Sequence, residues 1–247
     1  MKGTETIYGV HAVRVMLERH PGRVLTLRLA EQREDARVRA LEELAHRHQR
    51  PVQHVAAAAL KQLLGDVAHQ GVAADVAPLP PWREDQLLAA LQDASAPLLL
   101  ALDGVQDPHN LGACLRSADA CGALALIVPR DRAAQLSPAA RKVAAGAAET
   151  TPVVAVTNLV RTLKLLKSAG LWVVGADATA EKAAPEVDLR GAVVLVLGAE
   201  GTGLRHLTRQ NCDFLVRLPR LGAVESLNVS VAAGMLLYEA VRQRGRL

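Results

Sequence analysis

The chain has 247 residues, of which 50% are hydrophobic and 22% are charged, and its formal net charge is +4. These proportions are ordinary for a soluble globular protein with a buried core, and the length suggests one or two domains. Only 2% of the residues are aromatic, which excludes an RNA surface built from rows of stacked rings. The mild positive charge permits a polyanionic partner without requiring one.

Two further features concern location and metal binding. The N-terminal residues contain no apolar signal segment and no apolar run approaches membrane-spanning length, so we expect a cytoplasmic protein with no membrane partner. Cys114, Cys121 and Cys212 show no spacing typical of a metal site. Cys114 and Cys121 lie in an apolar helical pattern, which predicts reduced thiols in the core.

The first third of the chain predicts a compact α/β unit. Apolar residues at helical spacing occupy 10–17, and a turn at Pro21 and Gly22 leads into an alternating strand over 24–29. The elements that follow are a charged helix over 35–48, a strand over 52–55, a helix over 57–64 and a strand over 72–76.

Prolines at positions 78, 80 and 81 interrupt regular structure after this unit. We therefore divide the chain into a domain over 1–77, a linker over 78–94 that contains a short helix, and a second domain over 95–247. In the second domain nearly continuous apolar strands alternate with helices, which indicates a parallel sheet covered by helices. The strands are expected at 98–102, 125–128, 153–156, 172–175, 193–197 and 214–218.

Three loops of the second domain could carry chemistry, because open α/β sheets bind ligands at the carboxyl ends of their strands. The first contains Asn110, where a helix N-cap is expected, before a helix over 113–120. Arg116 lies within the first two turns of that helix, and its guanidinium is a fork of donors suited to phosphate. Taken alone, this loop is better explained by a capping asparagine and a solvated arginine.

The second loop follows the apolar strand 193–197 and contains three glycines around Glu200. Gly198, Gly201 and Gly203 let the backbone approach a ligand closely. Their spacing is the reverse of the dinucleotide-binding fingerprint, which argues against an ordinary Rossmann cofactor site. Glu200 is either a partner for a helix dipole or a carboxylate aimed into a site.

The third loop follows the strand 214–218 and leads into an apolar helix over 231–242. Ser226 is the expected N-cap with Leu227 in the first turn, and Asn228 offers further side-chain hydrogen bonds. An ordinary capped helix is the better explanation of Ser226 alone. The combination of three such loops is harder to explain without a shared site.

Together these segments resemble motifs 1, 2 and 3 of the SpoU (TrmH-type) RNA 2′-O-ribose methyltransferase family, in the right order. The matching stretches are DPHNLGACLRSADACG, LVLGAEGTGL and LPRLGAVESLNVSVAAGMLLYEAVRQR. The last is highly specific, because polar SLN-S lies inside an otherwise apolar segment. Three more stretches, IYGVHAV, HQGVAADV and PRDRAAQLSPAARKVAAGAAET, are similar to the bacterial members that methylate a guanosine of 23S rRNA.

The resemblance implies an α/β fold in two parts: a small L30e-like domain that binds the RNA substrate, and a parallel-sheet SPOUT methyltransferase domain with a deep trefoil knot. It implies a homodimer, S-adenosylmethionine as cofactor, no metal, and 23S rRNA or a ribosome assembly precursor as partner. The methyl group would pass to the ribose 2′-hydroxyl of a guanosine in the peptidyl-transferase P-loop. Related tRNA enzymes generally lack the front domain, which favours rRNA.

The resemblance also implies the residues of the site. The catalytic set is Asn110, Arg116, Glu200, Ser226 and Asn228. The cofactor set, acting largely through backbone groups, is Gly198, Gly201, Leu218, Gly222 and Leu227. Arg116 is the family's proposed general base. Because an arginine has a pKa above about 12 and stays protonated, an electrostatic role towards phosphate and a developing alkoxide is equally consistent.

Other basic residues are candidates for RNA contacts. They are Arg130, Arg132, Arg141 and Lys142 in the second domain and His11 and His69 in the first. A solvated charged segment, or a histidine that caps a turn, explains them as well. Two rival functions stay open: methylation of tRNA or of another rRNA nucleotide, and a non-catalytic RNA-binding assembly factor. An oxidoreductase would need a nucleotide fingerprint after the first strand of a βαβ unit, and the sequence has none.

Overall fold

The computed structural model describes residues 4–31, 35–77, 81–219, 221–223 and 226–245. The chain forms two compact units, Met1–Pro80 and Pro81–Leu247, and each is described by itself. Among the helices of the described residues, none is long and apolar enough to cross a membrane. The second unit holds all three loops singled out in the sequence.

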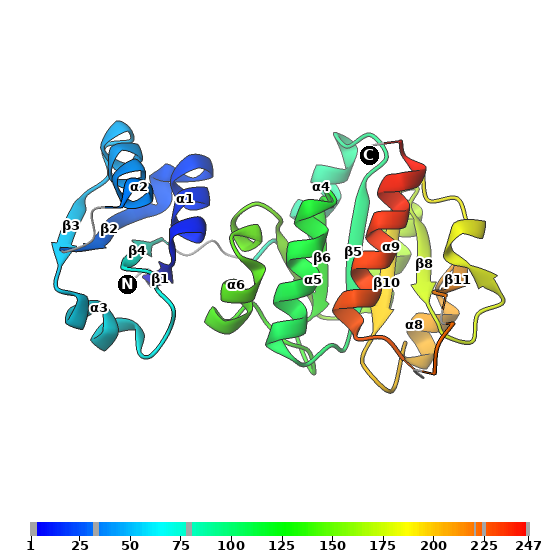
Figure 1. The fold of residues 1–247 in the computed structure, drawn as a ribbon. Helices are drawn as coiled ribbons and strands as arrows, with labels where there is room; N and C mark the ends of the chain where they lie inside the picture. Colours follow the sequence, from blue (N-terminus) through cyan, green and yellow to red (C-terminus); the bar gives the residue numbers. More distant parts are fainter. Residues whose placement is uncertain (1–3, 32–34, 78–80, 220, 224–225, 246–247) are drawn as a thin grey trace. The chain divides into compact units, whose positions relative to one another are not determined.

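The first unit is a four-stranded sheet with helices packed on it (Figure 1). Its elements in chain order are β1 (Glu5–Tyr8), α1 (Val10–Arg19), η1 (Pro21–Arg23), β2 (Val24–Ala30), α2 (Ala36–Arg47), β3 (Val52–Val55), α3 (Ala57–Leu64) and β4 (Val72–Val76). The strand order is β1-β4-β2-β3, with β2 and β3 parallel and the other neighbours antiparallel. β1 is not among the expected elements, because its four residues run almost directly into α1 and their alternation merges with the helical pattern.

The apolar faces of α1 and α2 form the core of this unit. Val13 and Leu17 of α1 and Leu41 of α2 are buried together with Leu27 of the sheet, which is the outcome expected of apolar residues at helical spacing. The second helix starts where the sequence predicts, because the Asp35 carboxylate accepts hydrogen bonds from two backbone N–H groups of its first turn.

The expected linker contains a helix that belongs to the second unit. Helix α4 (Glu84–Gln92) buries Leu87 and Leu91 in the core of that unit, and Trp82 pairs with Val154 of β7 through an isolated bridge. The second unit therefore begins at Pro81, and residues 78–80 lie outside the described residues.

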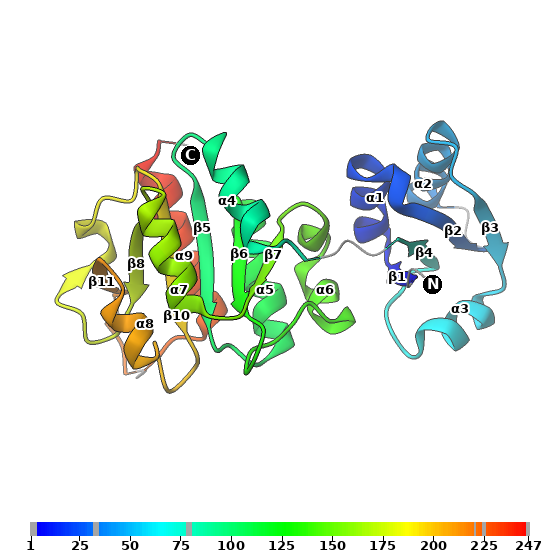
Figure 2. The same ribbon diagram turned by 180° about the vertical axis from the view of Figure 1, so that it is seen from behind.

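The second unit is a seven-stranded parallel sheet between two layers of helices. Its strands are β5 (Leu98–Asp103), β6 (Ala125–Pro129), β7 (Val153–Val156), β8 (Trp172–Ala176), β9 (Lys182–Ala183), β10 (Val193–Gly198) and β11 (Phe214–Arg217). Its further helices are α5 (Pro108–Ala120), α6 (Pro138–Ala144), η2 (Ala147–Glu149), α7 (Leu159–Ser168), η3 (Ala184–Glu186), α8 (His206–Gln210) and α9 (Val229–Gln243). Figure 1 shows α5 and α9 on one face of the sheet, and Figure 2 shows α4 and α7 on the other.

The side chains of β5 alternate between the two cores of the unit, one on each face of the sheet. Leu98, Leu100 and Leu102 face the core under α5 and α9, whereas Leu99 and Ala101 face the core under α4 and α7. A strand buried on both sides needs apolar residues at every position, because a polar side chain would be desolvated on either face. The predicted parallel sheet is confirmed. The two-residue strand β9 is too short to leave a sequence pattern.

The strand order β7-β6-β5-β10-β8-β11-β9 places β5 beside β10 at the centre of the sheet. Gly198, the last residue of β10, lies opposite Asp103, the last residue of β5. The loops after these two strands therefore leave the same edge of the sheet side by side. The trefoil knot that the resemblance implies stays a prediction.

Candidate functional site

Three side chains from the three loops meet in one hydrogen-bonded cluster. Asn228 donates from Nδ2 to Glu200 Oε1 at 2.7 Å and to Asn110 Oδ1 at 2.9 Å. Asn110 donates from Nδ2 to the same Glu200 oxygen at 3.3 Å, and the backbone N–H of Val229 also donates to it at 3.3 Å. Among the described residues, none donates to the other oxygen of Glu200. The cluster thus holds a carboxylate by one oxygen and leaves the second open.

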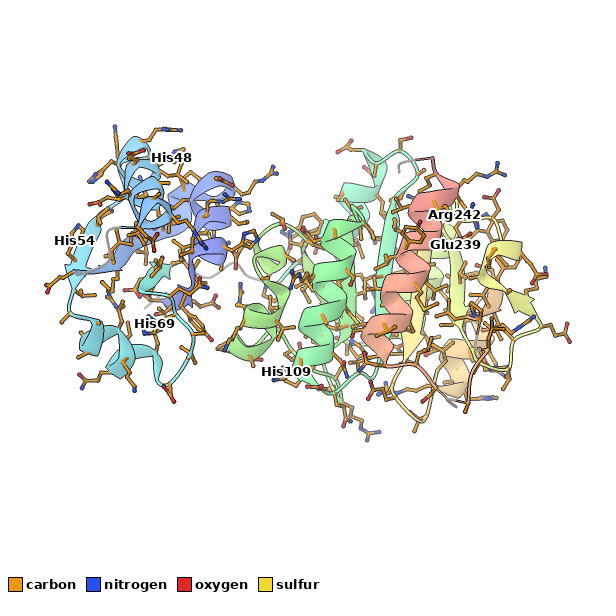
Figure 3. All side chains as sticks on the ribbon, viewed as in Figure 1. His48, His54, His69, His109, Glu239 and Arg242 are labelled. Carbon is orange, nitrogen blue, oxygen red and sulfur yellow. The ribbon has the colours of Figure 1, made fainter. Side chains whose placement is uncertain are left out.

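The caps of the two helices at this cluster differ from the expectation. Helix α5 begins at Pro108, and the carboxylate of Asp107 accepts from the backbone N–H of His109, so Asp107 is the N-cap and Asn110 is not. Proline is favoured at the first helical position, since it has no N–H to satisfy there. Asn110 therefore lies inside the first turn, and its amide is available to Glu200. His109, beside it, is exposed at the start of α5 (Figure 3).

The cap of α9 is Asn228, and the expectation that Ser226 caps this helix is wrong. Asn228 Oδ1 accepts from the backbone N–H of Ser230 at 2.9 Å and from its hydroxyl at 2.6 Å. The same side chain therefore starts the helix with its oxygen and joins the cluster with its nitrogen. Asparagine can do both, because its amide carries an acceptor and a donor on one planar group.

Arg116 does not join the cluster within one chain. It is exposed and makes no hydrogen bond or ion pair with the residues that the structure describes. Arg116 lies six positions after Asn110 in the same helix. This spacing places Arg116 about 120° away around the helix and about 9 Å further along the helix axis. In the isolated chain Arg116 is therefore a solvent-exposed arginine.

A cavity of about 510 Å³ opens beside the cluster. Of the expected site residues it is lined by Gly198, Glu200, Gly201, Leu218, Ser226 and Leu227. The remaining lining comes from Ala176, Asp177, Ala178, Thr179, Leu197, Ala199, Thr202, Gly203, Leu204, Arg209, Val216, Val229 and Ala232. Gly222 does not line it, and a Cβ added there meets nothing within 4 Å, so the structure gives no steric reason for glycine at that position.

Gly198 has a clear steric reason to be glycine. An added Cβ would lie 2.0 Å from the carbonyl carbon of Gly203, because the loop turns back on itself and Gly203 N–H donates to the carbonyl of Ala199 at 2.9 Å. Gly201 and Gly203 have positive φ angles of 75° and 65°, which side chains rarely tolerate. The glycine spacing therefore builds a tight loop that forms one wall of the cavity.

One wall of the cavity was not predicted from the sequence. The loop after β8 brings Asp177 and Thr179 to it; Asp177 accepts from the Thr179 hydroxyl at 2.7 Å and from Arg209 Nε at 2.6 Å. Burial raises the pKa of Asp177, but these hydrogen bonds outweigh it and hold the pKa below its ordinary value. This loop also leaves a strand at its carboxyl end, so the rule that indicated the other loops could have found it.

The residues expected to contact RNA differ in whether they already interact with other parts of the protein. Arg141 pairs with the buried Glu149 at 2.6 Å and so stabilises its own unit. His69, labelled in Figure 3, accepts at Nδ1 from the backbone N–H of Gly71 and so caps a turn. His11, Arg130, Arg132 and Lys142 are exposed, and Arg130 Nε donates to the carbonyl of Ala155 at 3.3 Å.

Cys114 and Cys121, the thiols expected to be reduced and in the core, are free cysteines, but only Cys114 is buried, whereas Cys121 is partly buried at the edge of the core. Burial raises the pKa of Cys114 to about 12, and it is also the main cause that raises the pKa of Cys212 to about 12. Such thiols stay protonated at neutral pH and are poor nucleophiles.

Two family models match the chain. The model described as SpoU rRNA Methylase family matches residues 97–238, and the model described as RNA 2'-O ribose methyltransferase substrate binding matches residues 6–82. The chain belongs to the SpoU rRNA methylase family. The matched ranges contain the cluster, the cavity and the sheet of the first unit except for its first residue, Glu5.

Relatives and solved structures add detail to this membership. The 23S rRNA (guanosine-2'-O-)-methyltransferase RlmB of Pseudomonas aeruginosa is 55% identical over 99% of this chain and 98% of its own. The SpoU methyltransferase AviRb from Streptomyces viridochromogenes, solved in complex with the cofactor AdoMet, is similar with a TM-score of 0.81 at 26% identity, covering 99% of this chain and 92% of that one. The A. aeolicus TrmH/SpoU tRNA modifying enzyme is 30% identical with a TM-score of 0.57, covering 66% of this chain and 85% of its own.

Proposed function

We propose that this protein transfers a methyl group from S-adenosylmethionine to the ribose 2′-hydroxyl of a guanosine in 23S rRNA. The observation that carries the proposal is the 55% identity, over 99% of the chain, to a 23S rRNA (guanosine-2'-O-)-methyltransferase. We place the guanosine in the peptidyl-transferase P-loop, which is the target that the sequence resemblance implies. The tRNA modifying enzyme covers only 66% of this chain, so the whole two-unit chain is better accounted for by an rRNA substrate.

The cavity suits S-adenosylmethionine. A volume of about 510 Å³ lies within the range of about 300–1,000 Å³ usual for cofactor sites. Leu218 and Leu227 supply apolar surface, and the glycine loop that contains Gly198 lines the cavity with backbone groups that an adenosine can contact. When bound, the cofactor supplies a methyl group on a positively charged sulfur.

The cluster of Asn110, Glu200 and Asn228 can orient the accepting ribose. Three donors hold Glu200 by Oε1, so its other oxygen is left as an acceptor, and Glu200 also lines the cavity. In this proposal the 2′-hydroxyl donates to that oxygen, which aligns the lone pair of the hydroxyl with the methyl group. In the transfer the 2′-oxygen would gain the methyl group as its proton passes to that oxygen of Glu200, and the cofactor would be left as a neutral thioether.

Arg116 supplies positive charge rather than a base in this account. An arginine stays protonated at neutral pH, and its guanidinium is suited to a phosphate next to the reacting ribose. Because Arg116 lies away from the cluster in one chain, we propose that it reaches the ribose across a homodimer.

An exposed apolar stripe on α9 supports the homodimer. Val231, Met235 and Tyr238 follow one face of the helix at spacings of four and three residues, and their exposed fractions are 51%, 36% and 55%. Apolar side chains aligned on one helix face are typical of a surface covered by a partner. The stripe begins next to Asn228, so a second copy seated on it would lie close to the cluster.

The test of the proposed function is methyl transfer by the purified protein. Radiolabelled S-adenosylmethionine is offered with a transcript of the P-loop region of 23S rRNA and, separately, with tRNA. We expect label in the rRNA only, at the 2′-oxygen of one guanosine. Label in tRNA alone would contradict the proposal, and failure to bind S-adenosylmethionine would remove the enzyme.

A further inference from the structure

A buried carboxylate beside the cluster has an arginine as its counter-charge. Asp103, the last residue of β5, is 1% exposed. One of its oxygens accepts from the backbone N–H of Arg205 at 2.9 Å, and the other lies 3.5 Å from the Arg205 guanidinium without a hydrogen bond. A buried charge is costly without a partner, so Asp103 holds both the backbone and the head group of Arg205 in place.

The donors of this guanidinium remain available. Among the described residues, none accepts a hydrogen bond from it, and 49% of the side chain is exposed. An arginine used only to bridge two loops would direct its donor fork at the carboxylate in two short parallel bonds. The charge of Arg205 is balanced by Asp103, while its guanidinium N–H groups have no acceptor among the described residues. These N–H groups can therefore donate to a bound anion.

Gly104 shapes the seat of Arg205. Its φ is +83°, and an added Cβ would lie 2.8 Å from Nη2 of Arg205. The guanidinium therefore rests on the bare backbone of the first loop, whereas its own residue follows the glycine loop after β10. Arg205 thus connects two loops: the loop after β5, which leads to Asn110, and the loop after β10, which carries Glu200.

The position of Arg205 favours substrate over cofactor. Leu204 lines the cavity, but the next residue, Arg205, does not. The guanidinium therefore lies outside the space that we assign to S-adenosylmethionine and its carboxylate. The reacting 2′-hydroxyl of an RNA is adjacent to a phosphodiester on the same ribose, so anionic groups must approach this edge of the sheet.

We propose that Arg205 binds a backbone phosphate of the substrate RNA, and that Asp103 and Gly104 position it for this contact. The inference rests on the proposed function, since it concerns the RNA that the same site methylates. Arg205 fixes the strand in the site and reads no base, because phosphate contacts position a nucleic acid without specifying its sequence.

The test compares two variants that differ only in the guanidinium. Asp103→Asn keeps Arg205, and Asp103→Asn with Arg205→Met removes it without leaving a buried charge unpaired. The amide oxygen introduced at position 103 can still accept from the backbone N–H of residue 205, so both variants should fold, which thermal unfolding checks. Arg190→Met is the charge control, because Arg190 pairs with Asp188 on the surface, with 70% of its side chain exposed, ahead of the amino end of β10.

The measurement is the affinity for the P-loop transcript as a function of salt, with affinity for S-adenosylmethionine determined in parallel by calorimetry. We expect the double variant to bind RNA about tenfold more weakly than Asp103→Asn at low salt. The slope of log affinity against log salt should be shallower by about 0.7–0.9, the value for one lost phosphate contact. Cofactor affinity should be equal in the two variants, and Arg190→Met should match the wild type.

Two results would overturn the inference: equal RNA affinity and salt slope in the two Asp103 variants, or a loss of cofactor affinity that accompanies the loss of the guanidinium. Both readouts are binding measurements. A wild-type protein that binds RNA and cofactor but transfers no methyl group would therefore refute the proposed function separately.

Discussion

At the scale of single residues, Asn228 carries two roles that can be separated. Its oxygen starts α9 through Ser230, and its nitrogen holds Glu200 and Asn110. The stability of the helix and the geometry of the cluster are thus linked through one planar amide.

Asn228→Ser should separate the two roles. Serine caps helices as well as asparagine does, so the free energy of unfolding should change by less than about 0.5 kcal/mol. Its hydroxyl is too short to reach both Glu200 and Asn110, so methyl transfer should fall about 100-fold through misplacement of the carboxylate. Single-turnover kinetics and chemical denaturation measure the two effects.

Asn228→Ala is the matched control, because it also removes the cap and should cost about 1 kcal/mol of stability. Equal activity of the serine variant and the wild type would show that the cluster is not part of the reaction.

The sequence indicates that these residues belong to one site better than it predicts their local roles. Asn110, Glu200 and Asn228 are indicated by family resemblance, yet both caps at the cluster are misassigned. Asp107 competes with Asn110 for the same cap, and a proline at the next position decides between them. Such a choice depends on backbone angles, which residue types alone do not determine.

At the scale of elements, the segment from α6 to η2 is held by a buried ion pair. Arg141 on α6 and Glu149 on η2 are 15% and 4% exposed, with 2.6 Å between nitrogen and oxygen. Residue types alone leave this segment open between RNA contact and a solvated charged segment. They do not reveal that a carboxylate eight residues later pairs with the arginine.

Arg141→Met should therefore destabilise the protein. The substitution removes the arginine from a buried ion pair with Glu149, and loss of one partner of such a pair costs about 3–5 kcal/mol. Lys142→Met, at the exposed neighbouring position, removes the same charge and should change stability by less than about 0.5 kcal/mol. Equal unfolding midpoints of the two variants in urea would contradict a structural role for Arg141.

The apolar stripe of α9 yields a test of the homodimer. Met235→Glu places a charge at its centre and should raise the dimer dissociation constant at least about 100-fold, since a buried unpaired charge costs several kcal/mol. Leu63→Glu, at an apolar position of α3 that is 49% exposed, is the control. Sedimentation velocity distinguishes them, and a Met235→Glu protein that stays dimeric would exclude this face as the interface.

The elements themselves were largely predictable, and the exceptions have physical causes. The long strands of the second unit are apolar at every position because both faces are covered. Two strands were missed: β9 has two residues, too few for periodicity to show, and the alternation of β1 merges with the helical pattern of α1. Helix α4 was expected in a linker, but two buried leucines make it part of the second unit.

At the scale of the whole molecule, we propose that the two units divide substrate binding and methyl transfer between them. Each has its own core, and each matches a different family model, one for substrate binding and one for methylation. A protein of residues 81–247 should therefore fold and bind S-adenosylmethionine with unchanged affinity.

The same protein should lose most of its preference for 23S rRNA over tRNA, because the substrate-binding unit is absent. Calorimetry and competition between the two RNAs check this prediction. Unchanged selectivity would contradict the division of labour, whereas loss of cofactor binding would show that the first unit is needed to form the cavity.

The most direct test of the central claim is a map of ribose methylation on 23S rRNA from a strain that lacks this protein. We expect a single guanosine in the P-loop to lose its 2′-O-methyl group, and we expect the wild-type chain, but not Asn228→Ser, to restore it. An identical methylation map with and without the protein would contradict the account.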